Sequence, residues 1–347
     1  MKIKILCMFV VAILFSYFLE LINFPANWLL GSLIVGMVFS LTWGNFNIHR
    51  NVFKGGLVLL GSSFGISLSL SFFSMLAGYT LPMIVMMVLI LGAFVLVTFI
   101  MYKNSNLDLP TAIYCCIPGG ASEVIGSSKD AGADESTVAA YHSLRIVMFV
   151  LLIPIILGVS IPTPPPTDFL LAFQSIQWQA IPFIIFILGI SFYLDKISPI
   201  PLGILFIGMI VSFVINITFN LHMEFQLIPI IGQIILGTLV GQKLTRVALK
   251  NIRAAGPIII ICLVIFLAIS FLIAFIFSMM SGLNYSVSLL ATVPAGAAEM
   301  SSTAFALNLD PTTIVAIHTV RVITIFLLLP FIRMFTLKHV PEKQCVT

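Results

Sequence analysis

The sequence predicts an all-α polytopic membrane protein that contains two copies of one structural unit. The first observation is composition: of 347 residues, 60% are hydrophobic and only 8% are charged. A soluble globule could not bury that much apolar surface, so the chain belongs with membrane proteins. The second observation is a repeat, because the segment PGGASEV at 118–124 recurs as PAGAAEM at 294–300, 176 residues later.

The repeat continues beyond these two segments without a gap, and 12 of 37 aligned positions are identical. The matched pairs are Pro118 with Pro294, Glu123 with Glu299, Asp134 with Asp310, His142 with His318 and Arg145 with Arg321. A fixed period with matched polar residues indicates an internal duplication. We therefore predict a first repeat over 1–162, a proline-rich linker over 163–176, a second repeat over 177–337 and a cytoplasmic tail over 338–347.

Ten apolar runs approach the length of roughly 20 residues that a membrane-crossing helix needs. They cover 3–22, 27–45, 53–73, 79–102, 137–160, 177–195, 200–220, 226–242, 257–280 and 312–336. Two further segments, 110–127 and 286–304, are too short and too rich in Gly, Ser and Pro for ordinary spans. Irregular backbone at membrane depth is tolerated only inside protein or beside a wet cavity. These two segments are predicted to be re-entrant or broken, and to mark a functional centre.

The placement of basic residues predicts the topology. Of the 16 Lys and Arg residues, Arg145 and Arg321 lie inside apolar helices, which leaves 14 to report orientation. With re-entrant motif segments and a cytoplasmic N-terminus, all 14 face the cytoplasm, whereas full crossings would give a split of 8 to 6. The positive-inside rule favours the first arrangement. Each repeat then crosses five times, so the second repeat is inverted, as in many secondary transporters.

Glu123 and Glu299 are the leading candidates for function. Each follows a Pro-x-Gly break by a few residues, so it is expected in the first turn of a half-helix, where the positive helix terminus favours a carboxylate. An intramembrane carboxylate marks an ion or proton pathway by default. The alternative is a structural role, in which each Glu neutralises a neighbouring Arg and holds helices together.

Each repeat also carries a histidine and an arginine three residues apart on one helical face: His142 with Arg145, and His318 with Arg321. Such a face could bind a carboxylate-bearing solute, and the histidine could relay a proton near neutral pH. The alternative is an internal Glu–Arg salt bridge that locks each broken segment against the next helix.

The remaining motif residues complete the predicted site or support it. Gly119, Gly120 and Gly296 are assigned to the same substrate- or ion-binding site as the glutamates. A structural role is predicted for Pro118 and Pro294 at the breaks and for Asp134 and Asp310 as helix N-caps. Gly61 and Gly65, with their counterparts 237 and 241, have the small-xxx-small spacing of close helix packing.

The doubled pattern P-G-G-x-x-E, then D, then H-x-x-R resembles the AbrB family of bacterial inner-membrane proteins. The likeness spans nearly the whole chain, with Ala295 standing where the first copy has Gly119. The resemblance implies a multi-pass protein of the bacterial cell membrane, built from two duplicated halves and distantly similar to cation/proton antiporters and anion transporters. Members are often labelled ammonia monooxygenases or regulators.

Three functions are compatible with these features. The preferred one is a secondary transporter of a small anionic or zwitterionic solute, coupled to H⁺ or Na⁺ through the paired glutamates. The second is a membrane sensor or regulator of gene expression. The third, an oxygenase, lacks a metal-ligand cluster, so the sequence predicts no enzyme, no metal and no cofactor. The expected partners are the solute, the coupling ion and the lipid bilayer, with no nucleic acid; a homo-oligomer is compatible with the sequence.

Overall fold

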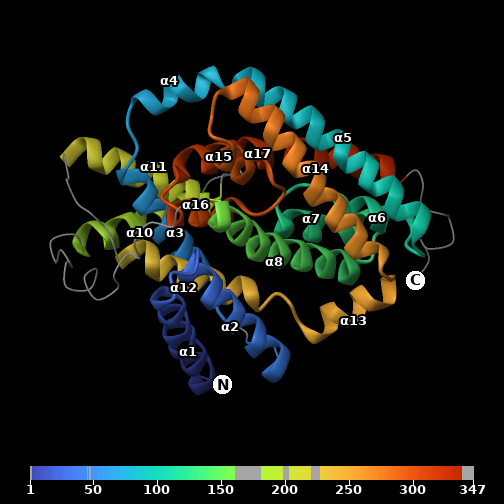
Figure 1. The fold of residues 1–347 in the computed structure, drawn as a ribbon, viewed down its shortest axis with the longest axis horizontal. Helices are drawn as coiled ribbons and strands as arrows, with labels where there is room; N and C mark the ends of the chain where they lie inside the picture. The colour runs from blue at the N-terminus through green and yellow to red at the C-terminus, as the bar shows by residue number, and fades with distance from the viewer. Residues whose placement is uncertain are drawn as a thin grey trace.

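The computed structural model describes residues 2–44, 46, 48–160, 181–197, 203–219 and 227–337, and every regular element within these ranges is a helix (Figure 1). The first half contains α1 (Lys2–Leu21), α2 (Asn27–Trp43), α3 (Arg50–Ile66), α4 (Ser71–Gly78), α5 (Thr80–Asn104), α6 (Leu109–Cys116), α7 (Ala121–Ser128), the short 3-10 helix η1 (Lys129–Ala131) and α8 (Glu135–Ser160). The second half contains α10 (Ile181–Ile197), α11 (Ile204–Phe219), α12 (Leu227–Gly241), α13 (Arg246–Ala255), α14 (Ile258–Ser281), α15 (Tyr285–Thr292), α16 (Ala297–Ala306) and α17 (Pro311–Leu337). The predicted linker and the predicted tail lie outside the described residues.

The helix boundaries follow the offset of the sequence repeat. Leu109 and Tyr285, which begin α6 and α15, are 176 positions apart, and the same offset relates the last residues of these helices. It also relates the first residues of α7 and α16 and those of α8 and α17. The same local sequence signals therefore produce matching helix starts in these two segments.

Within the part of the chain that the structure describes, five helices are long and apolar enough to cross a membrane: α1, α5, α8, α14 and α17. The number rises to six if α12 and α13, which meet at a bend of 52°, form one span. Most other predicted spans correspond to shorter helices, such as α2 with 17 residues and α11 with 16 residues. The prediction of an all-helical membrane-type fold is confirmed, whereas the count of ten spans stays a prediction.

The predicted apolar run 53–73 is wrong at its C-terminal end. Helix α3 ends at Ile66, and the chain turns before α4 begins at Ser71. Hydropathy alone does not detect this turn, because the residues on both sides of it are apolar. Ser67 and Ser69 in the turn offer side-chain hydroxyls that compete for backbone hydrogen bonds, which favours turns over a continuing helix.

The two halves of the chain meet in a close crossing, where α3 packs closely against α11 and α2 packs closely against α12. A Cβ atom added at Gly61 would lie 2.2 Å from the carbonyl oxygen of Leu205, and one added at Gly237 would lie 2.4 Å from that of Leu29. Glycine is needed here because any side chain would force the two backbones apart. The two contacts are counterparts, since each residue of the first is 176 positions from a residue of the second.

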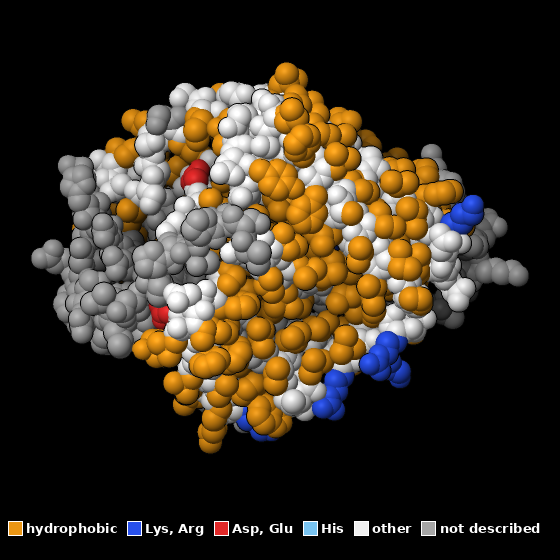
Figure 2. All heavy atoms as spheres, in the orientation of Figure 1, with side chains coloured by type: hydrophobic (Ala, Val, Ile, Leu, Met, Phe, Trp, Pro, Cys, Tyr) orange, Lys and Arg blue, Asp and Glu red, His pale blue; other side chains and the backbone are white. Residues whose placement is uncertain are grey.

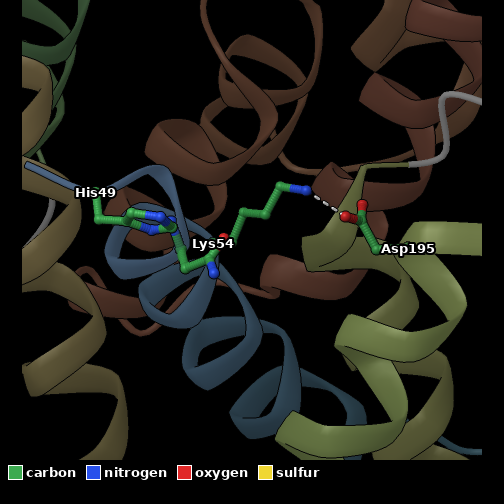
Figure 3. A network of polar contacts seen from close by, with 4 residues as sticks. His49, Lys54 and Asp195 are labelled. Atoms are coloured by element: carbon green, nitrogen blue, oxygen red, sulfur yellow. Dashed lines mark hydrogen bonds and ion pairs between the residues drawn. The ribbon is translucent and has the colours of Figure 1, made fainter.

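Polar contacts join the same helices from both sides. The Ser40 hydroxyl donates to the carbonyl oxygen of Gln242 over 3.1 Å, and the Asn216 amide donates to that of Ile66 over 3.0 Å. These two bonds are counterparts as well, because Ser40 and Asn216 are 176 positions apart, and so are Ile66 and Gln242. At one end of the crossing Lys54 of α3 forms an ion pair with Asp195 of α10, while His49 accepts the backbone N–H of Asn51 and caps α3 (Figure 3).

Replacing Gly241 by alanine is expected to destabilise the protein through this crossing. A Cβ at position 241 would lie 2.2 Å from the carbonyl oxygen of Leu33. Overpacking of this kind costs typically about 1–3 kcal/mol. The melting temperature in detergent should therefore fall, whereas Gly92→Ala, at a position with open space around it, should leave it unchanged. Equal melting temperatures for both variants would contradict the close crossing.

The surface separates apolar from basic regions. Hydrophobic side chains cover most of the described face in Figure 2, while the visible Lys and Arg side chains lie along its lower and right-hand edges. Large apolar residues of α5 and α14 point outward, with Val88 65% and Leu272 59% exposed. An apolar face with cations along its edges is the pattern expected of a membrane protein.

Candidate functional site

Among the described residues, the motif segment of each half forms two short helices separated by a break, which we call a broken helix; the bend between α12 and α13 is a separate feature. In the first broken helix, α6 ends at Cys116 and α7 begins at Ala121; in the second, α15 ends at Thr292 and α16 begins at Ala297. Proline explains both breaks, because it has no N–H to donate and restricts the residue before it to extended conformations. Ile117 and Val293, which precede the prolines, accordingly have ψ angles of 123° and 138°.

A break leaves the carbonyl groups at the end of the first half-helix without helical partners. In the first broken helix, the side chains of His142 and Arg145 on α8 donate hydrogen bonds to these carbonyls. Nη1 of Arg145 donates to the carbonyl oxygen of Ile117 over 2.8 Å, and Nε2 of His142 lies 3.0 Å from that of Tyr114. Because a carbonyl only accepts, Nε2 carries the proton, and Nδ1 of His142 accepts from Nη2 of Arg145 over 2.9 Å.

The second broken helix repeats the contacts to backbone carbonyls with one more of them, but without the bond between Arg and His. Nε2 of His318 lies 2.8 Å from the carbonyl oxygen of Leu290. The Arg321 guanidinium donates to the carbonyl oxygens of Val293 and Ala295, each over 2.7 Å, and more weakly to that of Thr292 over 3.4 Å. Both arginines are buried, with exposed fractions of 3% for Arg145 and 2% for Arg321.

The His-x-x-Arg pair therefore caps the C-terminal end of the preceding half-helix. A cation at that end is also favoured by the negative pole of the helix dipole. Among the described residues neither Glu123 nor Glu299 forms an ion pair with an arginine, so the Glu–Arg salt bridge considered as an alternative is not observed there. The sequence could not distinguish these partners, because every residue offers a backbone carbonyl.

The glutamates lie at the other side of each break, as predicted. Glu123 is the third residue of α7 and Glu299 the third residue of α16, so both are in the first turn. Each side chain folds back toward the glycine before the helix. A Cβ added at Gly120 would lie 2.2 Å from Oε2 of Glu123, and one added at Gly296 would lie 1.8 Å from Oε2 of Glu299. Glycine at this position thus makes room for the carboxylate.

The two glutamates differ in exposure. Glu123 is exposed, whereas Glu299 is only 5% exposed. Gly119 also differs from its counterpart Ala295, since a Cβ at position 119 would lie 2.7 Å from the side chain of Ile325. The two broken helices have the same local geometry in unlike surroundings.

Asp134 and Asp310 cap the helices that carry the His-x-x-Arg pairs. Asp134 accepts the backbone N–H groups of Ser136 and Thr137, each over 3.2 Å, and Asp310 accepts those of Thr312 and Thr313 over 2.9 and 3.3 Å. These are N-cap hydrogen bonds.

Sequence reasoning missed the matching caps of the first half-helices. Asp108 accepts the backbone N–H of Thr111 over 3.0 Å at the start of α6, and Asn284 accepts that of Ser286 over 3.0 Å at the start of α15. The available signal was Pro110 two residues after Asp108, which is typical of a helix start.

Some buried polar atoms beside the second break have no hydrogen-bond partner within the described protein. They include Nδ1 of His318 and Nε of Arg321. With its proton on Nε2, His318 offers a lone pair at Nδ1, while Nε of Arg321 offers a donor. Buried polar atoms are almost always satisfied, so these two could hold a polar ligand. The described residues contain no group of three or more His, Cys, Asp or Glu side chains with metal-binding geometry.

The fold and the site together define a helical membrane-type protein with two broken helices, each carrying a Glu at one side of its break and capped at the other by a His–Arg pair. A family profile described as "Transition state regulatory protein AbrB" matches residues 28–336, so the chain belongs to the AbrB family.

Two relatives match the chain over most of its length. The Bacillus subtilis (strain 168) protein named "Uncharacterized protein YhjN" is 25% identical over 358 aligned positions, which cover 95% of this chain and 92% of the relative. The Escherichia coli (strain K12) protein named "Putative regulator AbrB" is 24% identical over 341 positions, covering 96% and 97%. No solved structure gives a significant match.

Proposed function

We propose that this protein is a secondary transporter of a small anionic or zwitterionic solute, built from two inverted repeats and coupled to H⁺ or Na⁺ through Glu123 and Glu299. The observation that carries the proposal is the pair of broken helices. Each has a carboxylate at the start of its second half, a backbone opened by Pro and Gly, and a buried cation nearby. Broken helices of this kind form substrate and ion sites in transporters with internal repeats.

The contacts between the halves support the duplication. Gly61 against Leu205 has its counterpart in Gly237 against Leu29. Moving by 176 residues turns each contact of this kind into the other one, with the two halves interchanged. A two-fold relation between the repeats would produce such a pattern. With five crossings in each repeat, this relation would be an inversion, and the two breaks would approach the middle of the membrane from opposite faces.

The charges at each break suit a transport site. The Arg and His side chains donate most of their hydrogen bonds to backbone carbonyls, so they determine the shape of the break. The glutamates are paired with no Lys or Arg among the described residues. An intramembrane carboxylate without a cationic partner is costly unless it binds a cation or a proton. This favours the glutamates as the coupling groups, and leaves Nε of Arg321 and Nδ1 of His318 to contact the solute.

The unequal exposure of the glutamates fits a transporter observed in one of its access states. Exposed Glu123 would face the open side, and buried Glu299 the closed side. In the opposite state their exposures would exchange.

A second candidate function is a membrane regulator of gene expression. It is favoured by the description of the family and by the name of the Escherichia coli relative. In this role the broken helices would bind the solute as a signal, and a partner protein would carry the output. Deletion that changes gene expression without changing any solute flux would favour the regulator.

The first experiment is thermal stability of the purified protein in detergent against small carboxylates, amino acids and monovalent cations. We expect one solute to raise the melting temperature of the wild type and to lose this effect in Glu123→Gln and in Glu299→Gln. Glu135→Gln, an exposed glutamate outside the first broken helix, is the matched control and should retain the effect. Uptake of the solute into proteoliposomes under a proton or sodium gradient then identifies the coupling ion.

The proposal would be overturned if every variant responded like the wild type, or if no imposed gradient drove flux of the stabilising solute. Stoichiometric copper or iron in the purified protein would instead support the oxygenase. Unfolding of both variants in the absence of ligand would make the glutamates structural.

A further inference from the structure

The geometry of α13 points to a binding surface for anionic phospholipid headgroups, formed by Lys250 and Arg253 and positioned by Arg246. The ten residues Arg246–Ala255 separate two apolar helices, and α13 is bent by 52° from α12. The next helix, α14, begins at Ile258, and Ile260 and Ile261 are already about half exposed, at 52% and 49%. Helix α13 therefore lies where an apolar span ends, which is the expected position of a headgroup layer.

The two faces of α13 have opposite character. Ala248 and Ile252, four residues apart, are buried with exposed fractions of 7% and 6%, and the helix packs against α8. Arg246, Lys250 and Arg253 recur at the spacing of one helical face and are all exposed. An amphipathic helix with a basic face is typical of elements that lie in a membrane interface.

The cations Lys250 and Arg253 on the basic face are available to bind an anion. Its sequence, RVALKNIRAA, contains no acidic residue. Among the described residues no carboxylate forms an ion pair with Lys250 or Arg253. Arg246 has a different role, because Nε and Nη2 donate to the carbonyl oxygens of Leu41 and Thr42 and so tie α13 to the end of α2. Lys250 and Arg253 are thus held in place on a fixed helix with their charges uncompensated.

Charge complementarity selects the partner. A headgroup phosphate carries the negative charge that this face lacks, and basic clusters beside membrane spans attract anionic lipids. Helix α4 (Ser71–Gly78), which occupies the corresponding position in the first half, has the sequence SFFSMLAG and carries no charge. The basic surface is therefore a feature of the second half that its first-half counterpart lacks, and it does not depend on the proposed transport function.

The test compares binding of phosphatidylglycerol and phosphatidylcholine to the full-length protein in detergent by native mass spectrometry and by thermal shift. We expect the wild type to retain and to be stabilised by phosphatidylglycerol. Lys250→Gln/Arg253→Gln should weaken this binding by roughly 30-fold, since each cation beside an anionic surface contributes about fivefold. The control Lys103→Gln/Lys129→Gln removes the same charge at two other exposed lysines and should change binding by less than about twofold if α13 is the site.

Equal losses in the two double variants would overturn the proposal, because the effect would then reflect net charge. Equal affinity of the wild type for both lipids would also overturn it, and an acidic protein would become the partner to seek. Soluble glycerol phosphate serves as a third probe: competition by it at low concentration would assign the surface to a free phosphate compound and exclude the lipid.

Discussion

Arg321→Met is expected to prevent the protein from accumulating as a folded, monodisperse species in detergent. The guanidinium donates to the carbonyl oxygens of Val293 and Ala295 at 2.7 Å and to that of Thr292 at 3.4 Å. Methionine fills similar space but donates nothing, so the carbonyls of Ala295 and Thr292 would lose the guanidinium in a buried break, while that of Val293 would keep only the backbone N–H of Ala295. Each unsatisfied buried group costs about 1–3 kcal/mol. The sum is comparable with the whole stability of a typical domain, which is about 5–15 kcal/mol.

The matched control is Arg333→Met on the same helix, because Arg333 is exposed. It should retain the folded peak in size-exclusion chromatography and a melting temperature close to the wild type. Arg145→Met should be intermediate, since the first break has one strong bond to a carbonyl and one at 3.5 Å. If Arg321→Met instead melted like the wild type, the guanidinium would not be holding the break together, and its role would move to ligand binding.

Features fixed by neighbouring residues could be predicted from the sequence, whereas contacts between distant parts of the chain could not. The positions of Glu123 and Glu299 in a first turn follow from the Pro-x-Gly signal three to five residues upstream, which is local, and they are confirmed. The carbonyl partners of Arg145 and Arg321 lie 26 to 29 residues away along the chain, and no residue type identifies a backbone carbonyl as a partner. Neither their identity nor the loss of the salt-bridge alternative could be predicted from sequence.

The difference between the two glutamates is likewise tertiary. Glu123 and Glu299 occupy equivalent positions in their half-helices, yet one is exposed and the other is 5% exposed. A repeat in sequence specifies equal local structure and leaves the surroundings of each copy open. The same limit applies to the spans, because hydropathy does not detect the turn between Ile66 and Ser71 that ends α3.

The broken helices assign separate tasks to their charged groups. Arg and His complete the backbone hydrogen bonds on one side of the break, so replacing them should first lower the stability of the fold. The glutamates touch the helix on the other side, where an N-terminal carboxylate is favoured but not required for the backbone to be satisfied. This division predicts that position and charge of the carboxylate can be altered while the fold remains.

Gly296→Ala and Gly120→Ala test the position of the carboxylate without removing its charge. A Cβ at 296 would lie 1.8 Å from Oε2 of Glu299, and one at 120 would lie 2.2 Å from Oε2 of Glu123, so each side chain must rotate away. Because a carboxylate is the flexible end of its side chain, stability should change little, by about 1 kcal/mol for the poorer N-cap. A charge-assisted hydrogen bond contributes about 1.5–3 kcal/mol, so binding of the stabilising solute should weaken about tenfold or more.

Gly126→Ala provides the control within α7, since a Cβ at that position meets no atom within 4 Å. It should keep the affinity of the wild type for the solute found by thermal shift. If the alanines at 120 and 296 also kept it while Glu123→Gln and Glu299→Gln lost it, the charge alone would matter and the folded-back geometry would have no functional role. If the alanines lost both affinity and the folded peak, the glycines would be needed for the break itself, and the carboxylates would count as part of its architecture.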